Sequence, residues 1–197
     1  MPDVKHFDPQ EALERAERVF WQHGSAAASV QVLTAATGLN RSSLYATFGS
    51  KQELYLAALR HYIGTTSHPA FRALAEDERG LPAVRDFFDG LITLRCTGPY
   101  AGWGCMVVNA QAGTENADPQ VRAVLAEHHT QLCAAFRTAL ETARAQGQLS
   151  PDLPLAETAE SLALLAYGVN LHSRSGATAD TLRRTTAHTL DTLTRKA

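Results

Sequence analysis

The chain alternates between stretches with apolar residues at helical spacing and short breaks rich in Gly, Pro and capping residues. Such spacing places the apolar side chains on one face of a helix, whereas a half-buried strand needs apolar residues at every second position. The sequence contains no convincing series of strands. We therefore predict an all-α protein, with helices over residues 9–23, 30–37, 41–48, 51–67, 70–77, 81–95, 105–111, 119–146 and 155–173 and a last helix after residue 178.

The segment from residue 30 to residue 51 predicts two short helices, a tight turn and the start of a third helix. Gly38 supplies the backbone freedom that ends the first helix, and Asn40 can cap the second. Leu44 and Phe48 lie one turn apart and are expected to be buried. A Ser-x-x-Glu capping box then starts the next helix. This order of elements is typical of a helix-turn-helix.

The second helix of a helix-turn-helix enters the major groove of DNA with its N-terminal residues at the base edges. Arg41 can reach a guanine edge or a phosphate, while Tyr45 and Lys51 are better suited to phosphates. The formal net charge is -2, but no Asp or Glu occurs between Arg18 and Gln52, which favours a local positive surface. The candidate DNA-binding residues are Arg41, Ser42, Ser43, Tyr45, Thr47 and Lys51.

The same pattern has a second interpretation. Short helices joined through Gly are common in all-α proteins, so Leu44 and Phe48 could belong to an ordinary core with no connection to DNA. Because acids and bases nearly balance in the N-terminal part, a helical small-molecule carrier that binds no DNA is a further alternative.

The run from Gly38 to Leu54 resembles the N-terminal signature of the TetR family of bacterial transcriptional regulators. The diagnostic positions of that family are present as Leu44, Tyr45, Phe48 and Lys51, while Ala46 stands where many members have a large aromatic residue or His. The resemblance implies an N-terminal three-helix helix-turn-helix lobe and a larger C-terminal helical lobe. We expect the DNA-binding domain at residues 1–52 and the ligand-binding and dimerisation domain at residues 53–197.

The resemblance also implies how such a protein assembles. In the family the last two helices pair with those of a second copy, so that two recognition helices about 34 Å apart read the halves of a palindromic operator. The alternative is that both helices are intramolecular core, which the polar run Thr185 to His188 leaves open.

A small-molecule effector is expected in the larger lobe, and its release of the operator would make the protein a repressor by analogy. Sites of this kind are mostly apolar with a few polar groups. The candidate ligand-binding residues are Tyr62, Phe88, Trp103, Met106, Asn109, Phe136, Tyr167 and His172, with Phe87, Leu91 and Gln111 as further candidates. Each of them has the alternative role of ordinary core packing.

The three cysteines, Cys96, Cys105 and Cys133, fit neither a disulfide framework nor a zinc motif. The segment from Gly104 to Val108 resembles the one that carries a reactive thiol in TetR members that sense electrophiles or oxidants. Cys105 is therefore a redox candidate, and its alternative role is that of a buried structural residue.

Metal binding, catalysis and membrane insertion are not expected. His128 and His129 are adjacent and point about 100° apart on a helix, and neither His172 nor His188 completes a zinc spacing. The sequence has no nucleophile elbow, phosphate loop or dinucleotide fingerprint, so we expect no enzymatic activity and no cofactor. No apolar stretch reaches the roughly 20 residues of a membrane helix, and the first residues do not resemble a signal peptide, so a cytoplasmic location is expected.

Overall fold

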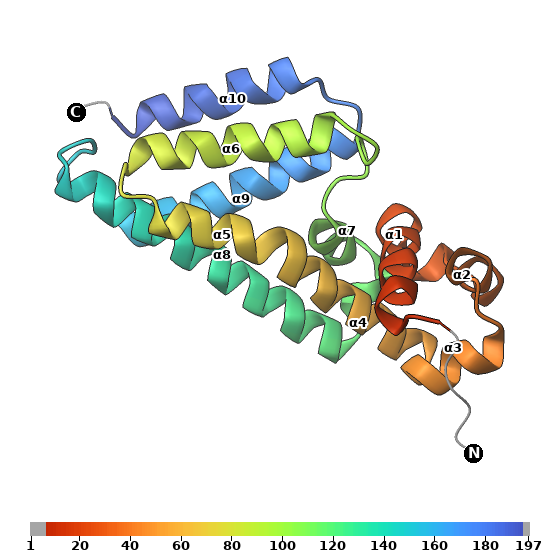
Figure 1. Cartoon of the computed structure of the whole chain (residues 1–197). Coiled ribbons are helices and arrows are strands. Elements are labelled where there is room, and N and C mark those ends of the chain that lie inside the picture. Colours follow the sequence, from red (N-terminus) through yellow and green to blue (C-terminus); the bar gives the residue numbers. More distant parts are fainter. Residues whose placement is uncertain (1–6, 195–197) are drawn as a thin grey trace.

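The computed structural model describes residues 7–194, so the outer ends of the two expected domains, residues 1–6 and 195–197, lie outside the described residues. A small lobe at one end of an elongated molecule contains the first three helices, and the remaining helices form a larger lobe beside it (Figure 1). The all-α prediction is confirmed, because the described residues contain helices and no strand. The helices are α1 (Pro9–Ala27), α2 (Val30–Thr37), α3 (Arg41–Phe48), α4 (Lys51–Tyr62), η1 (Ile63–Ser67), α5 (His68–Glu76), α6 (Leu81–Cys96), α7 (Met106–Ala112), η2 (Thr114–Ala117), α8 (Pro119–Ala145), α9 (Leu155–Arg174) and α10 (Ala179–Thr192).

Capping side chains set the starts of several helices, as the sequence predicts. Asp8 accepts a hydrogen bond from the amide of Gln10 at the start of α1, and Asp118 does the same for two amides of α8. Near the other end of α1, Gly24 has φ 76° and ψ 165°, so the regular helix is interrupted there. A left-handed φ of this kind favours Gly over other residues. The predicted end of the first helix near residue 23 therefore corresponds to a kink in α1.

The predicted break between residues 67 and 70 is wrong. Helix α4 continues through the π-helical segment η1 into α5 without a loop. Pro69 lies in the first turn of α5, where its missing amide hydrogen and its fixed φ cost a helix little. Residues 51–76 therefore form one long helical rod that leads from the small lobe along the larger one (Figure 1).

The buried apolar residues form two clusters. The first surrounds α1 to α4 and extends into α7 and the start of α8, with Phe20, Leu33, Leu44 and Tyr55 nearly inaccessible to solvent. The second fills the space between α5, α6, α8, α9 and α10. Because α4 belongs to the first cluster and α5 to the second, the helical rod is shared by both cores.

The α5–α6 turn is fastened to the end of α8. The side chain of Gln148 accepts a hydrogen bond from the amide of Leu81 and donates one to the carbonyl of Arg79. Gly80 has φ 71°, and a Cβ added there would lie 2.7 Å from the Cα of Ala143. This close approach requires Gly and holds the α5–α6 turn against α8. Figure 1 shows α5 and α6 diverging away from this turn.

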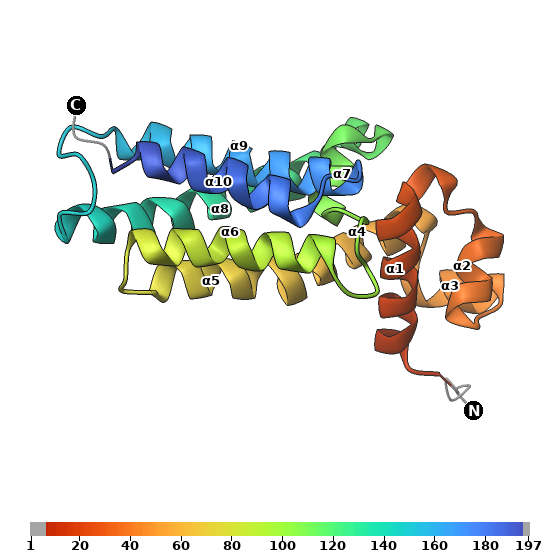
Figure 2. The same ribbon diagram turned by 90° about the horizontal axis from the view of Figure 1, so that it is seen from above.

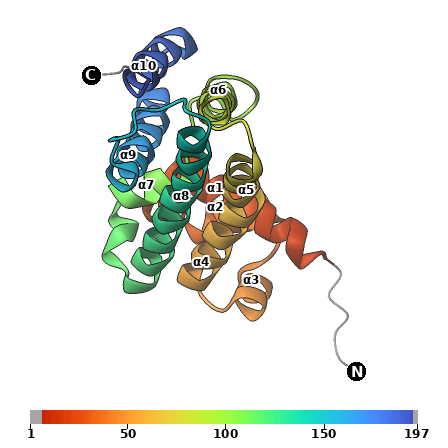
Figure 3. The same ribbon diagram turned by 90° about the vertical axis from the view of Figure 1, so that its left-hand side faces the viewer.

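Helices α9 and α10 form the outer layer of the larger lobe, with α10 lying against α6 as well as α9 (Figures 2 and 3). Their inner faces belong to the second cluster through Leu162, Leu182 and Leu190. On the outer side of α9, Leu164 and Leu171 remain 57% and 48% exposed. Among the described residues, no helix is long and apolar enough to span a membrane.

Candidate DNA-binding surface and ligand cavity

Helix α3 is fixed by its caps and by one deeply buried side chain. Oδ1 of Asn40 accepts hydrogen bonds of 2.8 Å from the amide of Ser43 and from the hydroxyl of Ser42. Leu44 is completely buried in the first cluster, and Gly49, with φ 80°, ends the helix. These contacts leave the opposite side of α3 facing outward at the tip of the small lobe.

The candidate DNA-binding residues lie on or beside this outward side. Arg41 and Ser42 are exposed, and Ser43, Tyr45, Thr47 and Lys51 are partly exposed. The guanidinium carbon of Arg41 is 5.6 Å from the centre of the Tyr45 ring, within the range of a cation–π contact. Among residues 7–194, neither Arg41 nor Lys51 forms an ion pair with a carboxylate. Their charges are therefore free to meet phosphates.

Polar contacts connect the small lobe to the helical rod and to α8. His61 on α4 lies within hydrogen-bonding distance of Glu17 on α1 through Nδ1 and of Gln10 through Nε2. The pKa of Glu17 is raised, mainly by burial, although His61 opposes the shift. Gln52 donates a hydrogen bond of 2.9 Å to Asp118 at the start of α8. These contacts join α4 to α1 and to the start of α8.

A cavity of about 370 Å³ lies between α5 and α6 in the larger lobe. Its volume falls within the usual range of small-molecule sites. Its walls come from η1, α5, α6, α7, α8 and α9 and are mostly apolar. The lining residues are Thr66, Ser67, Ala70, Phe71, Ala73, Leu74, Asp77, Ala83, Asp86, Phe87, Gly90, Leu91, Leu94, Arg95, Cys105, Val108, His128, Leu132, Ala166, Tyr167 and Asn170.

Only part of the candidate ligand-binding set lines this cavity. Tyr167 does, and so do Phe87, Leu91 and the redox candidate Cys105. The other candidates lie elsewhere. Tyr62 and Trp103 pack against Trp21, and Phe88 and Phe136 stack on each other in the second cluster. Met106 and Asn109 line a smaller pocket next to Gly24, His172 is exposed on α9, and Gln111 is partly buried at the end of α7.

Arg95 is a lining residue that the sequence analysis missed. Its side chain is only 4% exposed, yet no carboxylate pairs with it within residues 7–194. Nε donates to Oδ1 of Asn170 at 2.6 Å and Nη2 donates to the hydroxyl of Tyr62 at 2.9 Å, while Nη1 has no partner among the described residues. Arg95 follows Ile92 and Phe88 at helical spacing, so a charge at a core position of α6 was the signal for it.

His128 is the second missed polar residue in the cavity wall. It is 4% exposed, its Nε2 lies 3.1 Å from the hydroxyl of Ser67, and its Nδ1 has no partner in the described part of the chain. Burial lowers its pKa to about 4, with smaller contributions from His68 and His129. The imidazole is therefore neutral near pH 7.

The redox candidate Cys105 is 4% exposed at the start of α7. It neighbours Tyr62, whose pKa is raised well above its usual value, first by burial and then by the Cys105 thiol, while Arg95 opposes the shift. Tyr62 thus lies beside both Cys105 and Arg95, which line the cavity, although Tyr62 itself does not.

His129, Cys133 and Glu160 form the set of side chains closest to a metal-binding arrangement in the described residues. Their ligand atoms lie within 4.8 Å of one another. Cys133 donates to Glu160 at 3.2 Å, and burial followed by Glu160 raises the pKa of the Cys133 thiol to about 12. His129 also contacts Glu160 and Tyr167. The thiol is therefore protonated and the set forms a satisfied hydrogen-bond network.

Comparison with protein families identifies both lobes. Residues 12–58 match the model described as bacterial regulatory proteins of the tetR family, and residues 80–189 match the tetracyclin repressor-like C-terminal domain. The chain is 28% identical to the HTH-type transcriptional repressor ComR of Escherichia coli K12 over 188 residues, which cover 94% of this chain and 89% of ComR. It is 31% identical to the HTH-type transcriptional regulator YezE of Bacillus subtilis, over 74% of this chain and 75% of YezE.

Solved structures of TetR family regulators also resemble this chain in fold. A cysteine-substituted form of the TetR family regulator CifR, in complex with 26-base-pair operator DNA, superposes with a TM-score of 0.85 and 27% identity and covers 96% of this chain and 98% of CifR. The reduced form of Escherichia coli NemR shares the fold, with a TM-score of 0.77 and 20% identity over 92% of this chain and 95% of NemR.

The fold and the outward face of α3 thus define a helix-turn-helix DNA-binding regulator, and the predicted DNA-binding class is confirmed over the carrier alternative. The chain belongs to the TetR family of bacterial transcriptional regulators. These relatives are regulators, in agreement with the prediction that the chain is not an enzyme.

Proposed function

We propose that the protein is a cytoplasmic transcriptional repressor that binds a palindromic operator as a homodimer and leaves it when a small molecule occupies the cavity between α5 and α6. Residues 1–52 act as the DNA-binding domain, and residues 53–197 bind the ligand and form the dimer. The main support for this proposal is the outward face of α3. It combines Arg41, Ser43, Tyr45 and Thr47 with Lys51 in a stretch that has no acidic residue.

The exposed leucines of α9 support the dimer. Leu164 and Leu171 are seven residues apart, which places them two turns apart on one side of the helix. Large exposed apolar residues grouped in this way are typical of an interface. Pairing of α9 and α10 with the same helices of a second copy covers them and gives the complex two recognition helices.

The helical rod provides the connection between cavity and DNA. Residues of η1 and α5 line the cavity, while α4 contacts α1 through His61 and Glu17. A ligand that prefers one position of the rod shifts the spacing of the two recognition helices. A coupling of about 1–3 kcal/mol between the sites changes DNA affinity roughly 5- to 150-fold.

The proposal is tested by selecting duplexes from a random pool with the full-length protein and then measuring transcription from a promoter that contains the selected site. We expect an inverted repeat whose half-sites are about one DNA turn apart and a decrease in transcription when the protein is added. A selected pool without an inverted repeat, or transcription that is unchanged or raised, would contradict it.

A thiol-based sensor that acts through Cys105 is the second candidate function. Cys105 lines the cavity beside Tyr62 and Arg95, which favours it as a target for an electrophile that enters there. In this case N-ethylmaleimide releases the operator from the wild type and not from Cys105→Ser. Cys133→Ser is the matched control, because the raised pKa of Cys133 keeps that thiol protonated. Equal release from Cys105→Ser and the wild type excludes this function.

A further inference from the structure

Arg95 is a buried cation without a counter-ion in the larger lobe. Removal of a charge from water costs several kcal/mol unless a partner compensates for it, so buried charged groups are usually paired. Arg95 has two neutral hydrogen-bond partners, Asn170 and Tyr62, and its guanidinium carbon lies 5.9 Å from the centre of the Trp21 ring, while its Nη1 has no hydrogen-bond partner in the described part of the chain. The oxygen of Asn170 is already bound by Arg95 and the amide of Asn170 is bound by Ala166. No carboxylate among the described residues therefore compensates the charge of Arg95.

The rest of the cavity is suited to an apolar molecule. Phe71, Leu74, Phe87, Leu91 and Leu132 are typical of its wall. If one water-sized unit occupies about 30 Å³, the cavity of about 370 Å³ has room for roughly a dozen non-hydrogen atoms. The polar lining includes Thr66, Ser67, Tyr167 and the neutral imidazole of His128, whose Nδ1 has no partner among the described residues. One charged group and a compact apolar body thus describe the ligand.

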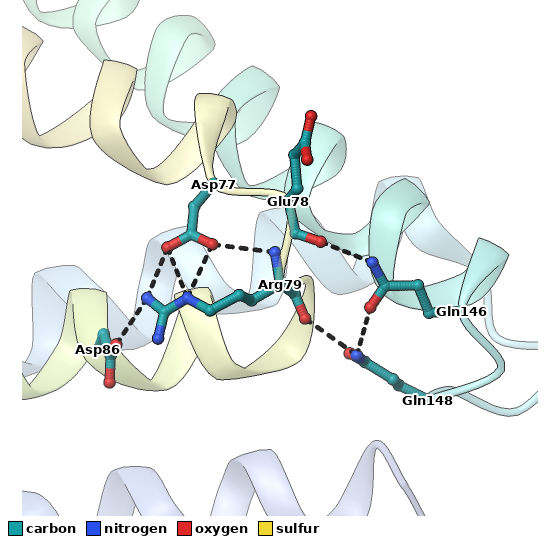
Figure 4. Close-up of polar contacts among 6 residues, drawn as sticks. All are labelled: Asp77, Glu78, Arg79, Asp86, Gln146 and Gln148. Carbon is teal, nitrogen blue, oxygen red and sulfur yellow. Dashed lines mark hydrogen bonds and ion pairs between the residues drawn. The ribbon is translucent and has the colours of Figure 1, made fainter.

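The opposite end of the cavity is acidic, which fixes the orientation of such a ligand. Asp77 and Asp86 line the end near the α5–α6 turn, where Arg79 binds Asp77 at 2.6 Å and Asp86 at 2.8 Å (Figure 4). One guanidinium for two carboxylates leaves a net negative charge there. Asp86 and Arg95 are nine residues apart on α6, or about 13 Å along the helix. An anionic group is therefore repelled from the Asp end and attracted to the Arg95 end.

We infer that the cavity binds a lipophilic monocarboxylate, with the carboxylate on Arg95 and an apolar body of about ten carbons extending along α6 toward the α5–α6 turn. The Nη1 group that has no partner in the described part of the chain can donate a charge-assisted hydrogen bond to a carboxylate. A doubly charged group such as a phosphate monoester is disfavoured, because Arg95 is the only unpaired cation among the described residues that line the cavity. The inference rests on the proposed function, since it names the ligand class of the proposed effector site.

Binding is measured by calorimetry on the full-length protein with decanoate and 1-naphthoate as a straight-chain and an aromatic acid, and with decanol and decylamine as neutral and cationic analogues. We expect at least one of the two acids to bind about tenfold or more tightly than decanol, in line with the strength of a charge-assisted hydrogen bond. Decanol binding as tightly as both acids would overturn the inference. The comparison of the acids with decanol on the wild-type protein tests the inference even if an Arg95 variant does not fold.

Three variants locate the bound acid. Arg95→Met should abolish the preference for the acid and retain decanol binding. Gly90→Leu should weaken the binding of both decanoate and decanol, because Gly90 lines the cavity and an added side chain there meets no other atom and can take up space in it. Cys105→Ser should keep the preference, since no thiol chemistry is involved. Acid binding that survives both Arg95→Met and Gly90→Leu, or that is lost in Cys105→Ser, would contradict the assignment.

Operator binding by the same samples without ligand separates this inference from the proposed function. If the protein binds its operator but prefers decanol, the ligand class is wrong and the repressor proposal stands. If it prefers the acid but selects no DNA, the ligand class stands and the repressor proposal fails.

Discussion

Nε of Arg95 donates a hydrogen bond to Oδ1 of Asn170 over 2.6 Å, joining α6 to α9 inside the larger lobe. Both residues are buried, and Asn170 is a neutral partner for a permanently charged one. This relationship distinguishes the cavity from a plain apolar core. It also allows the charge of the site to be changed by one atom, through Asn170→Asp.

Asn170→Asp places a carboxylate where a hydrogen-bond acceptor already lies 2.6 Å from Arg95. The new internal counter-ion should compete with a ligand carboxylate, so the preference for decanoate over decanol should disappear. Calorimetry checks the affinities. Asn116→Asp, which makes the same change at an exposed residue of η2, is the matched control and should leave the preference intact. Unchanged decanoate binding by Asn170→Asp would contradict the role given to Arg95.

His128 predicts a dependence of stability on pH. Its pKa is lowered to about 4 by burial, below the ordinary value of 6.5, so the unfolded chain binds more protons than the folded one between these values. The contribution of the neutral His128 to the free energy of unfolding is fully present above pH 6.5 and is lost as the pH falls toward 4. The free energy of unfolding should decrease by up to about 3 kcal/mol over this range because of His128.

Urea denaturation at pH 7 and pH 4.5 measures this effect. His128→Gln should show a smaller decrease than the wild type, whereas His23→Gln, a change at an exposed residue of α1, should show the same decrease. If His128→Gln and the wild type lose equal stability, His128 is not held neutral by burial.

The outward face of α3 predicts two different kinds of DNA-binding defect. Arg41→Ala should relax sequence preference by roughly 5- to 150-fold, the range expected for loss of one base contact. Lys51→Ala should weaken binding to all duplexes and reduce the slope of log affinity against log salt by about one. Tyr45→Phe keeps the ring that lies under Arg41, so it should weaken binding without changing preference. Titrations of specific and scrambled duplexes at several salt concentrations distinguish these cases, and equal behaviour of all three variants would refute the assignment.

The exposed leucines of α9 predict how the dimer can be broken. Leu164→Glu combined with Leu171→Glu should shift the protein to monomers, because charges replace apolar side chains on the proposed interface. Analytical ultracentrifugation measures the change. Leu94→Glu, at a residue of α6 that is 47% exposed, is the matched control and should remain dimeric. A double variant that sediments like the wild type would place the interface elsewhere.

The helices were predictable because their signals are local. Asp8, Asn40 and Asp118 each accept amide hydrogen bonds at a predicted helix start. The junction near Pro69 was mispredicted, because Pro breaks a helix at an interior position but is tolerated in the first turn.

The cavity wall was only partly predictable. Phe87 and Phe88 are adjacent and equally apolar, yet only Phe87 lines the cavity, while Phe88 stacks on Phe136 in the core. Helical periodicity places a residue on a face but does not tell which face borders an empty volume. A charge at a core position of α6 was a local signal for Arg95, but no local pattern reports whether Arg95 or His128 has a partner among the described residues around it.

The most direct test of the central claim compares two duplexes, one with the complete selected inverted repeat and one with a half-site scrambled. If two copies of α3 read the DNA together, the complete site should bind two protomers with an affinity at least about 100-fold higher than the scrambled one, since each mismatched base pair costs about 1–3 kcal/mol. Fluorescence anisotropy with stoichiometric titration measures both quantities. Equal affinities for the two duplexes, or one protomer bound per complete site, would contradict the account.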